Sequence, residues 1–110
     1  MKRGMIGFTM NHNVYFWLKK DLSAEQIATF EAELSKLPKM GYIASGTVGK
    51  PAPTEERPAT DHSFSYTLTL SFKTLADHDF YQRDCPDHKH FVETCKPFFD
   101  RVVVYDSTPI

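Results

Sequence analysis

The chain has 110 residues, which is enough for one domain built around one hydrophobic core. Hydrophobic residues make up 41% of the chain and aromatic residues 14%, a composition that excludes a disordered protein. The 13 basic and 14 acidic side chains leave a net charge of −1, so no basic excess indicates a nucleic-acid or membrane partner. We therefore expect one globular domain over residues 1–110.

The N-terminal segment and the two cysteines bear on where the protein works. Glycine, threonine and asparagine interrupt the apolar residues of MKRGMIGFTMNHNV, which makes it too polar for a signal-peptide core. No stretch reaches the length of a membrane span. Cys85 and Cys95 are too few for a disulfide framework, which favours reduced thiols. We expect a cytoplasmic protein with an N-terminal arm at residues 1–11, of which residues 1–10 could instead add an edge strand.

The first half of the chain predicts a strand, a helix and a weaker strand. The segment HNVYFWL at 12–18 is aromatic and β-branched, with apolar side chains on both faces. Ser23 and Gln26 then have the spacing of a capping box, and a helix follows as far as Pro38. Residues 41–50 contain three glycines and predict a weaker strand, and residues 51–63 predict a Pro-rich loop or flap.

The second half predicts a strand, two helices and a last strand. FSYTLTLSF at 64–72 alternates between large apolar and small hydroxyl side chains, and the hydroxyl face is either a solvated surface or a cavity wall. Thr74 is expected to cap a short helix over 74–84. Pro86 begins another helix, capped by residue 84 or 85 and ending at Pro97. RVVVYDS at 101–107 is a final strand with apolar residues on both faces.

The order β-α-β-β-α-β predicts an α+β fold with a ferredoxin-like protomer, an antiparallel sheet and helices on one face. The helices cover only one face of that sheet, whereas the first and last strands carry apolar residues on both. A second copy of the same sheet is the simplest cover for the other face. We therefore predict a homodimer that pairs through the sheet face.

The stretch DCPDHKHF at 84–91 gathers two histidines, a cysteine and two aspartates, and helical spacing separates them. His88 shares a face with Phe91, Val92 and Cys95, while His90 points elsewhere, because residues two apart on a helix do not meet. A zinc site that uses both histidines is therefore not expected, and we predict no metal and no cofactor. His88 is either a core histidine or a general acid or base, and the second role requires titration between about pH 5 and 8.

Two other residues are candidates for the same site, and two histidines are weaker ones. His12 opens the first predicted strand and is either a hydrogen-bonded strand end or a catalytic group. Tyr81, in a helix with Leu75 and His78 at threefold spacing, is either a packed aromatic or a hydroxyl donor to a ligand. His62 is interpreted as a turn contact, and His78, between two aspartates, as a solvated side chain.

Four segments, taken in their order along the chain, resemble the stress-responsive dimeric α/β barrel domain family, often shortened to Dabb. They are HNVYFWLKKDLS, FSYTLTLSFKTLADHDFYQ, CPDHKHFVETC and RVVVYDSTP. The resemblance implies two ferredoxin-like protomers packed sheet to sheet as a dimeric barrel. In a plant polyketide cyclase of this family, equivalents of His88, Tyr81 and His12 serve acid/base ring closure. Cys85 stands where the family usually has a first histidine, and one extra residue separates Tyr81 from it.

Three hypotheses for function follow. The first is a stress-responsive protein of unassigned activity with a pocket for a small hydrophobic ligand near His88, resembling relatives without clear catalysis. The second is an acid/base enzyme, cyclase-like or lyase-like, that acts on a carbonyl or phenolic compound through His88, His12 and Tyr81. The third is a cofactor-free monooxygenase-like protein, which rests on fold analogy alone.

Overall fold

The computed structural model of the protein describes residues 10–41 and 43–110. The main elements are β1 (Met10–Leu18), α1 (Ala24–Lys36), β2 (Ser45–Gly49), β3 (Tyr66–Phe72), α2 (Leu75–Arg83), α3 (Pro86–Cys95) and β4 (Phe99–Ser107). Short 3-10 helices, η2 (Leu37–Lys39) and η3 (Lys96–Phe98), follow α1 and α3. The predicted order is confirmed. The expected N-terminal arm is corrected, because residues 10 and 11 belong to β1 and residues 1–9 lie outside the described residues.

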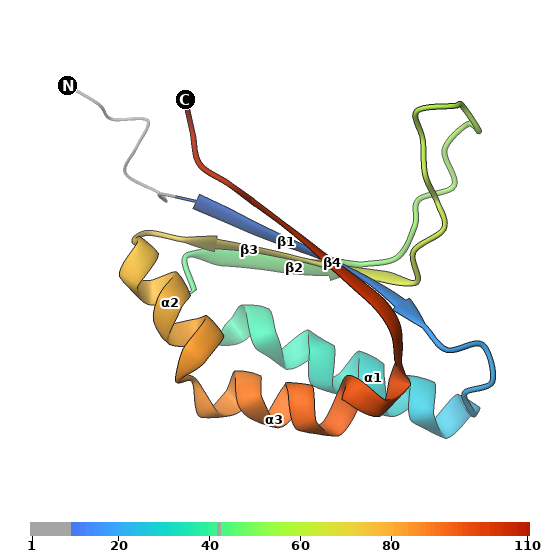
Figure 1. Cartoon of the computed structure of the whole chain (residues 1–110), viewed down its shortest axis with the longest axis horizontal. Coiled ribbons are helices and arrows are strands. Elements are labelled where there is room, and N and C mark those ends of the chain that lie inside the picture. Colours follow the sequence, from blue (N-terminus) through green and yellow to red (C-terminus); the bar gives the residue numbers. More distant parts are fainter. Residues whose placement is uncertain (1–9, 42) are drawn as a thin grey trace.

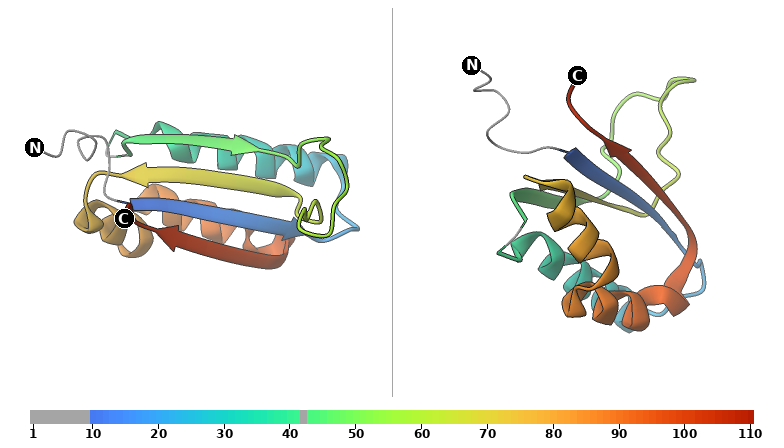
Figure 2. Two further views of the ribbon diagram at one scale, coloured as in Figure 1. Left: turned by 90° about the horizontal axis from the view of Figure 1, so that it is seen from above. Right: turned by 60° about the vertical axis from the view of Figure 1, so that its left-hand side comes forward.

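The strands form one antiparallel sheet in the order β2-β3-β1-β4, and the helices all lie against one face of it (Figures 1 and 2). β2 and β3 are the predicted hairpin, and each outer connection runs through helices. This topology confirms the ferredoxin-like α+β fold. None of the helices in the described segments is long and apolar enough to cross a membrane.

Local sequence signals explain where α1 begins and ends. The Ser23 hydroxyl accepts a hydrogen bond from the Gln26 backbone N–H at 3.1 Å, and the Gln26 side chain accepts one from the Ser23 N–H at 2.8 Å. This is the predicted capping box. Pro38 does not close the helix directly, because α1 ends at Lys36 and the chain continues as η2, whose second residue is Pro38. Proline is tolerated there because the first turn of a helix leaves its N–H groups unpaired.

The starts of all four strands differ from the sequence-based expectation. β1 begins at residue 10 rather than 12, β2 at 45 rather than 41, β3 at 66 rather than 64, and β4 at 99 rather than 101. A strand ends where its ladder partners end, which the pattern of one segment does not specify. The strict alternation in β3 is confirmed, because its large side chains are buried and face the helices: Tyr66, Leu68, Leu70 and Phe72.

The core lies between the sheet and the helices. Phe30 and Leu34 of α1 and Phe91 and Cys95 of α3 are buried against the inner face of the sheet. Fully burying one such phenylalanine or leucine contributes about 1.5–3 kcal/mol. The burial of Phe91 and Cys95 confirms the predicted inward face of α3. Phe91 packs against Phe16 of β1 and Phe99 of β4, which holds the helix over these two strands.

The first and last strands were predicted to be apolar on both faces, and the structure differs from this on the outer face of β1 and at the edge formed by β4. On β1 the outer face carries Asn11 and Asn13 in its first half and the aromatic Tyr15 and Trp17 in its second, so it is mixed rather than uniformly apolar. The 51–63 loop rises on this side, opposite the helices (Figure 1). On β4 the helix-facing Val102 and Val104 are 40% and 46% exposed. The inner face of the sheet is therefore incompletely covered along β4.

Candidate functional site: a pocket between the sheet and helices α2 and α3

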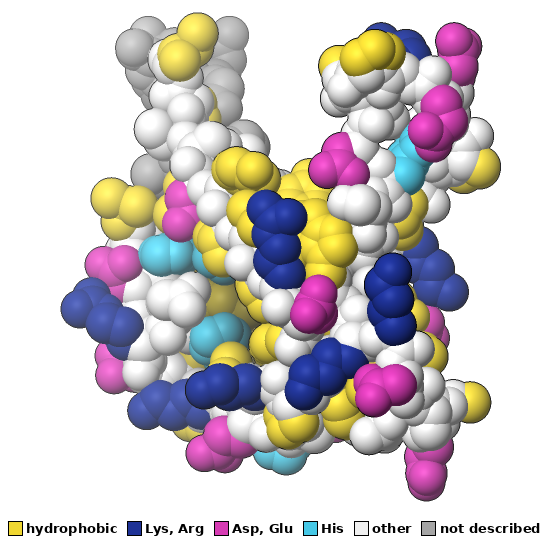
Figure 3. Space-filling model, turned by 45° about the vertical axis from the view of Figure 1, so that its right-hand side comes forward, with side chains coloured by type: hydrophobic (Ala, Val, Ile, Leu, Met, Phe, Trp, Pro, Cys, Tyr) yellow, Lys and Arg dark blue, Asp and Glu magenta, His cyan; other side chains and the backbone are white. Residues whose placement is uncertain are grey.

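A pocket of about 160 Å³ opens at the incompletely covered edge, between the sheet and the two helices α2 and α3. Its polar lining side chains are His12, Tyr81, Gln82 and His88, and the others are apolar, contributed by the sheet and by α3. The structure therefore places the three residues singled out from the sequence around one cavity. Figure 3 shows histidine side chains in a hollow of the surface beside hydrophobic ones.

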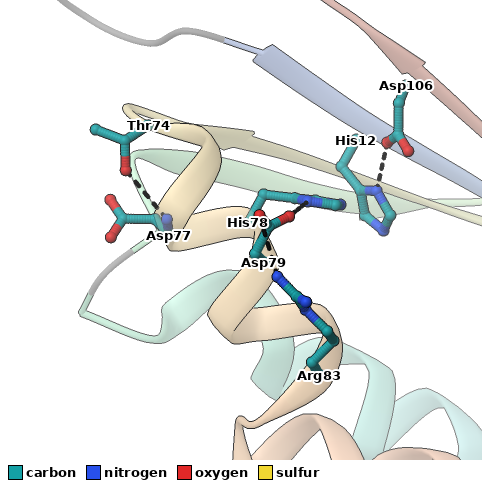
Figure 4. Close-up of polar contacts among 7 residues, drawn as sticks. All are labelled: His12, Thr74, Asp77, His78, Asp79, Arg83 and Asp106. Carbon is teal, nitrogen blue, oxygen red and sulfur yellow. Dashed lines mark hydrogen bonds and ion pairs between the residues drawn. The ribbon is translucent and has the colours of Figure 1, made fainter.

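His12 is held by an aspartate of the neighbouring strand. It is the third residue of β1, points toward the helices and is 3% exposed. The β1–β4 register sets it opposite Asp106, and the His12 Nδ1 lies 2.6 Å from the Asp106 Oδ1 (Figure 4). Burial lowers the pKa of His12, and Asp106 offsets only part of that effect. The ring is therefore neutral near pH 7, with Nδ1–H donating to the carboxylate and Nε2 left as an acceptor.

His88 and Tyr81 pack against each other on the other side of the pocket, with ring centres 4.4 Å apart. Burial, with a smaller effect from His12, lowers the pKa of His88 to about 4. Burial also raises the pKa of Tyr81 far above its ordinary value. At neutral pH, His88 is thus an uncharged acceptor and Tyr81 a protonated donor. The titration near neutrality expected of a catalytic His88 is not supported, because burial lowers the pKa of the ring well below that range.

The arrangement has a clear chemical character. Tyr81 lies between the two histidines, with its ring centre 5.8 Å from that of His12. Two neutral imidazoles and one phenol therefore face a cavity whose remaining walls are apolar except for Gln82. Such a cavity suits a small, mostly apolar molecule that carries an oxygen atom able to accept a hydrogen bond or to lose a proton.

Two residues of this region were missed or misjudged from the sequence. His78 was expected to be solvated, but its side chain is only 16% exposed and its ring centre lies 5.1 Å from that of His12. The threefold spacing of His78 and Tyr81 on α2 was the signal that could have placed it. Asp106 was not singled out, because its partner lies 94 residues away and only the strand register joins them.

The remaining candidate residues lie apart from the pocket. Cys85 precedes α3 as its N-cap residue, without a hydrogen bond from its side chain to the helix backbone, and its Sγ lies 3.7 Å from the Met40 Sδ. It is buried and is not among the residues that line the pocket. His62 contacts Thr54 and Glu56 within the 51–63 loop region, as a turn contact would. His90 is exposed on the outer side of α3, as helical spacing predicted.

Known structures share this fold over nearly the whole chain. A hydroxynitrile lyase from Passiflora edulis is 21% identical, with a TM-score of 0.76, and the match covers 94% of this chain and 95% of the lyase. A Dabb family protein from Mesorhizobium loti is 20% identical, with a TM-score of 0.72, over 94% and 98%. A dimeric protein of unknown function from Bacteroides fragilis is 21% identical, with a TM-score of 0.69, over 92% and 96%. Comparison with curated proteins found no match.

The fold and the pocket define a ferredoxin-like α+β protein with a cavity between its sheet and its helices. The family model of the stress responsive A/B barrel domain, Dabb, matches residues 10–109. The chain therefore belongs to the Dabb family. This confirms the resemblance drawn from the four sequence segments.

Proposed function

We propose that this protein binds a small, mostly apolar compound with one oxygen function in the pocket beside His88. The observation that carries this proposal is the convergence of His12, Tyr81 and His88 on one cavity whose other walls are mostly apolar. Val102 and Val104 leave its mouth partly exposed, which gives a ligand a way in. In this proposal the Tyr81 hydroxyl donates a hydrogen bond to the ligand oxygen, and the apolar walls supply most of the affinity.

Acid/base catalysis in the same pocket is the second candidate, because the His12–Asp106 pair resembles an oriented base more than a packing contact. A carboxylate that fixes the tautomer of an imidazole is a recurring feature of general bases. In a cyclase-like or lyase-like reaction, the His12 Nε2 would take a proton from a carbonyl or phenolic substrate, Tyr81 would donate a hydrogen bond to its oxygen, and neutral His88 would accept a hydrogen bond from the substrate. The hydroxynitrile lyase among the structural neighbours supports a lyase-type reaction. No specific contact favours a monooxygenase, so we do not propose one.

We also propose that the chain forms a homodimer through the outer face of its sheet. Tyr15 packs against Phe64 and Tyr105 there, with ring centres 5.1 and 6.1 Å away, and Tyr105 is 63% exposed. Exposed aromatic clusters of this kind are enriched at protein interfaces. Structural neighbours from Bacteroides fragilis and Thermobifida fusca are described as dimeric.

We further propose a cytoplasmic location and a role in stress responses. The free thiols of Cys85 and Cys95 support the location, because cytoplasmic cysteines are kept reduced.

A substitution that fills the mouth of the pocket tests the binding proposal. Val104→Trp places a large side chain at the cavity edge, and Val48→Trp is a matched control on the inner face of the opposite edge strand, with 37% exposure against 46%. With 4-methylphenol as the probe, calorimetry should show saturable binding to the wild type and to Val48→Trp, and at least tenfold weaker binding to Val104→Trp. Equal binding to all three proteins would place the ligand elsewhere and contradict the proposal.

A further inference from the structure

A second cluster of polar side chains lies beside the pocket, where α2 meets the end of β4. It consists of His12, His78 and Asp106, and one ligand atom from each lies within 4.8 Å of the other two. Figure 4 shows the three side chains converging from β1, α2 and β4. We propose that this cluster binds a divalent transition-metal ion of the zinc type. The proposal departs from the absence of a metal expected from the sequence, and it does not rest on the proposed ligand or activity.

The donor set matches the preferences of such ions. Two imidazole nitrogens and one carboxylate oxygen are ligands that Zn²⁺ takes in three-ligand sites, which leave one position for water. The same donor set on one side of an ion is typical of non-haem Fe²⁺ sites. Imidazoles whose nitrogens each lie about 2.1 Å from one tetrahedral ion have ring centres roughly 5 Å apart. The ring centres of His12 and His78 are 5.1 Å apart.

His78 is oriented for this role by a chain of contacts from its own helix. Its Nδ1 lies 3.1 Å from the Asp79 Oδ1, and the Arg83 Nη2 lies 3.3 Å from the other oxygen of Asp79 (Figure 4). The Nδ1–H therefore donates to the carboxylate, which leaves a lone pair on Nε2. Carboxylates fix metal-binding histidines in the same way. Within residues 10–41 and 43–110, the His78 Nε2 is buried and has no hydrogen-bond partner, a costly state that a metal ion would relieve.

His12 and Asp106 already approach as closely as two ligands of one ion. Their 2.6 Å contact holds one proton between Nδ1 and Oδ1. Two ligands of a tetrahedral ion lie about 3.3 Å apart, so an ion that binds both atoms separates them by roughly 0.7 Å and releases that proton. Asp106 is about half exposed, so its side chain has room to make this adjustment.

An ion can reach the cluster from solvent. A cavity of about 270 Å³, separate from the His88 pocket, has His78, Asp79 and Asp106 among its lining residues. The metal cluster thus lies between two cavities that share no lining residue, with His12 lining one and His78 and Asp106 lining the other. Its position would allow the open site on the metal to accept water or a small oxygen ligand.

Zinc titration of the full-length, untagged protein after chelator treatment tests the proposal. The variants His78→Gln and Asp106→Asn each remove one donor at nearly constant size, and His90→Gln is the control, because His90 is an exposed histidine near Glu33 on another face. Calorimetry with ZnCl₂ should show one ion per chain for the wild type and for His90→Gln, and at least tenfold weaker binding for the two other variants. No binding to the wild type up to about 1 mM zinc, an affinity weaker than about −4 kcal/mol, would overturn the proposal.

Two further outcomes are also decisive. Zinc binding that survives both His78→Gln and Asp106→Asn would assign the ion to another surface and overturn the proposal. If either variant fails to fold, ¹⁵N NMR of the wild-type imidazoles decides the question, because zinc should shift the nitrogen signals of His12 and His78 and leave His62 unchanged. Signals of His12 and His78 that stay unmoved would overturn it. Because no organic ligand is present in these measurements, a failure of 4-methylphenol binding would leave their result intact.

Discussion

His12 and Asp106 lie 94 residues apart in the chain, yet the His12 Nδ1 and the Asp106 Oδ1 are 2.6 Å apart. The antiparallel register of β1 and β4 sets the two residues directly opposite each other. This contact joins the two ends of the domain at the point where the pocket and the proposed metal cluster meet. Any change in the strand pairing would therefore disturb both.

Removing the Asp106 carboxylate should destabilise the fold. Asp106→Ala leaves the buried Nδ1–H of His12 without an acceptor, which costs about 1–3 kcal/mol. Asp106→Asn keeps an acceptor oxygen and should cost less. Urea unfolding measures both free energies, with Asp100→Ala on the same strand as the control, expected within about 0.5 kcal/mol of the wild type. Equal stability of wild type and Asp106→Ala would show that the contact contributes nothing to folding.

The stability of the protein should fall as the pH drops from 6.5 toward 4. The pKa of His88 is lowered from its ordinary 6.5 to about 4, so between these values the unfolded chain binds the proton and the folded chain does not. Above pH 6.5 the ring is neutral in both states, so this loss of stability is absent there. Thermal unfolding over this range should show a smaller loss for His88→Gln than for the wild type. The exposed-residue variant His90→Gln should keep the wild-type loss, and identical curves for all three proteins would refute the lowered pKa.

The capping box of α1 gives a prediction about local stability. Ser23→Ala removes the hydroxyl that accepts from the Gln26 backbone N–H and should cost about 1 kcal/mol in unfolding free energy. Ser35→Ala, in the last turn of the same helix, is the matched control and should not destabilise, because alanine is the better helix former there. Equal losses for the two variants would assign the effect to the helix as a whole rather than to its cap.

The outer face of the sheet should control the oligomeric state. Tyr15→Glu places a charge within the cluster formed with Phe64 and Tyr105, which a dimer interface would bury at high cost. Light scattering should give twice the 12.6 kDa chain mass for the wild type and the single chain mass for this variant. Ala32→Glu, on the exposed surface of α1, should remain dimeric. A monomeric wild type would contradict the interface.

Local patterns in the sequence were sufficient to predict most of the fold. The Ser23–Gln26 spacing predicted the start of α1, and the alternation through 64–72 predicted which face of β3 is buried. These signals depend on neighbours within a few residues, so one segment contains them. The order of the elements then restricted the sheet to a single common topology.

The site was predictable only in part, since its charged contacts are set by long-range geometry. Helical spacing singled out His88, the positions of His12 and Tyr81 in their predicted elements made them further candidates, and the family resemblance then implied roles for all three. The partner of His12 depended on the register between β1 and β4, and the burial of His78 depended on how α2 packs over β1. The low pKa of His88 likewise follows from burial in the assembled core, which composition and spacing do not show.

The central claim is that a ligand binds where His12, Tyr81 and His88 converge, and site-resolved NMR tests it most directly. Wild-type protein labelled with ¹⁵N at histidine is titrated with 4-methylphenol at neutral pH. The imidazole signals of His88 and His12 should move together with one saturation curve, while those of His62 and His90, which lie outside the pocket, stay in place. Saturable binding that leaves His88 and His12 unmoved, or no binding at all, would contradict the account.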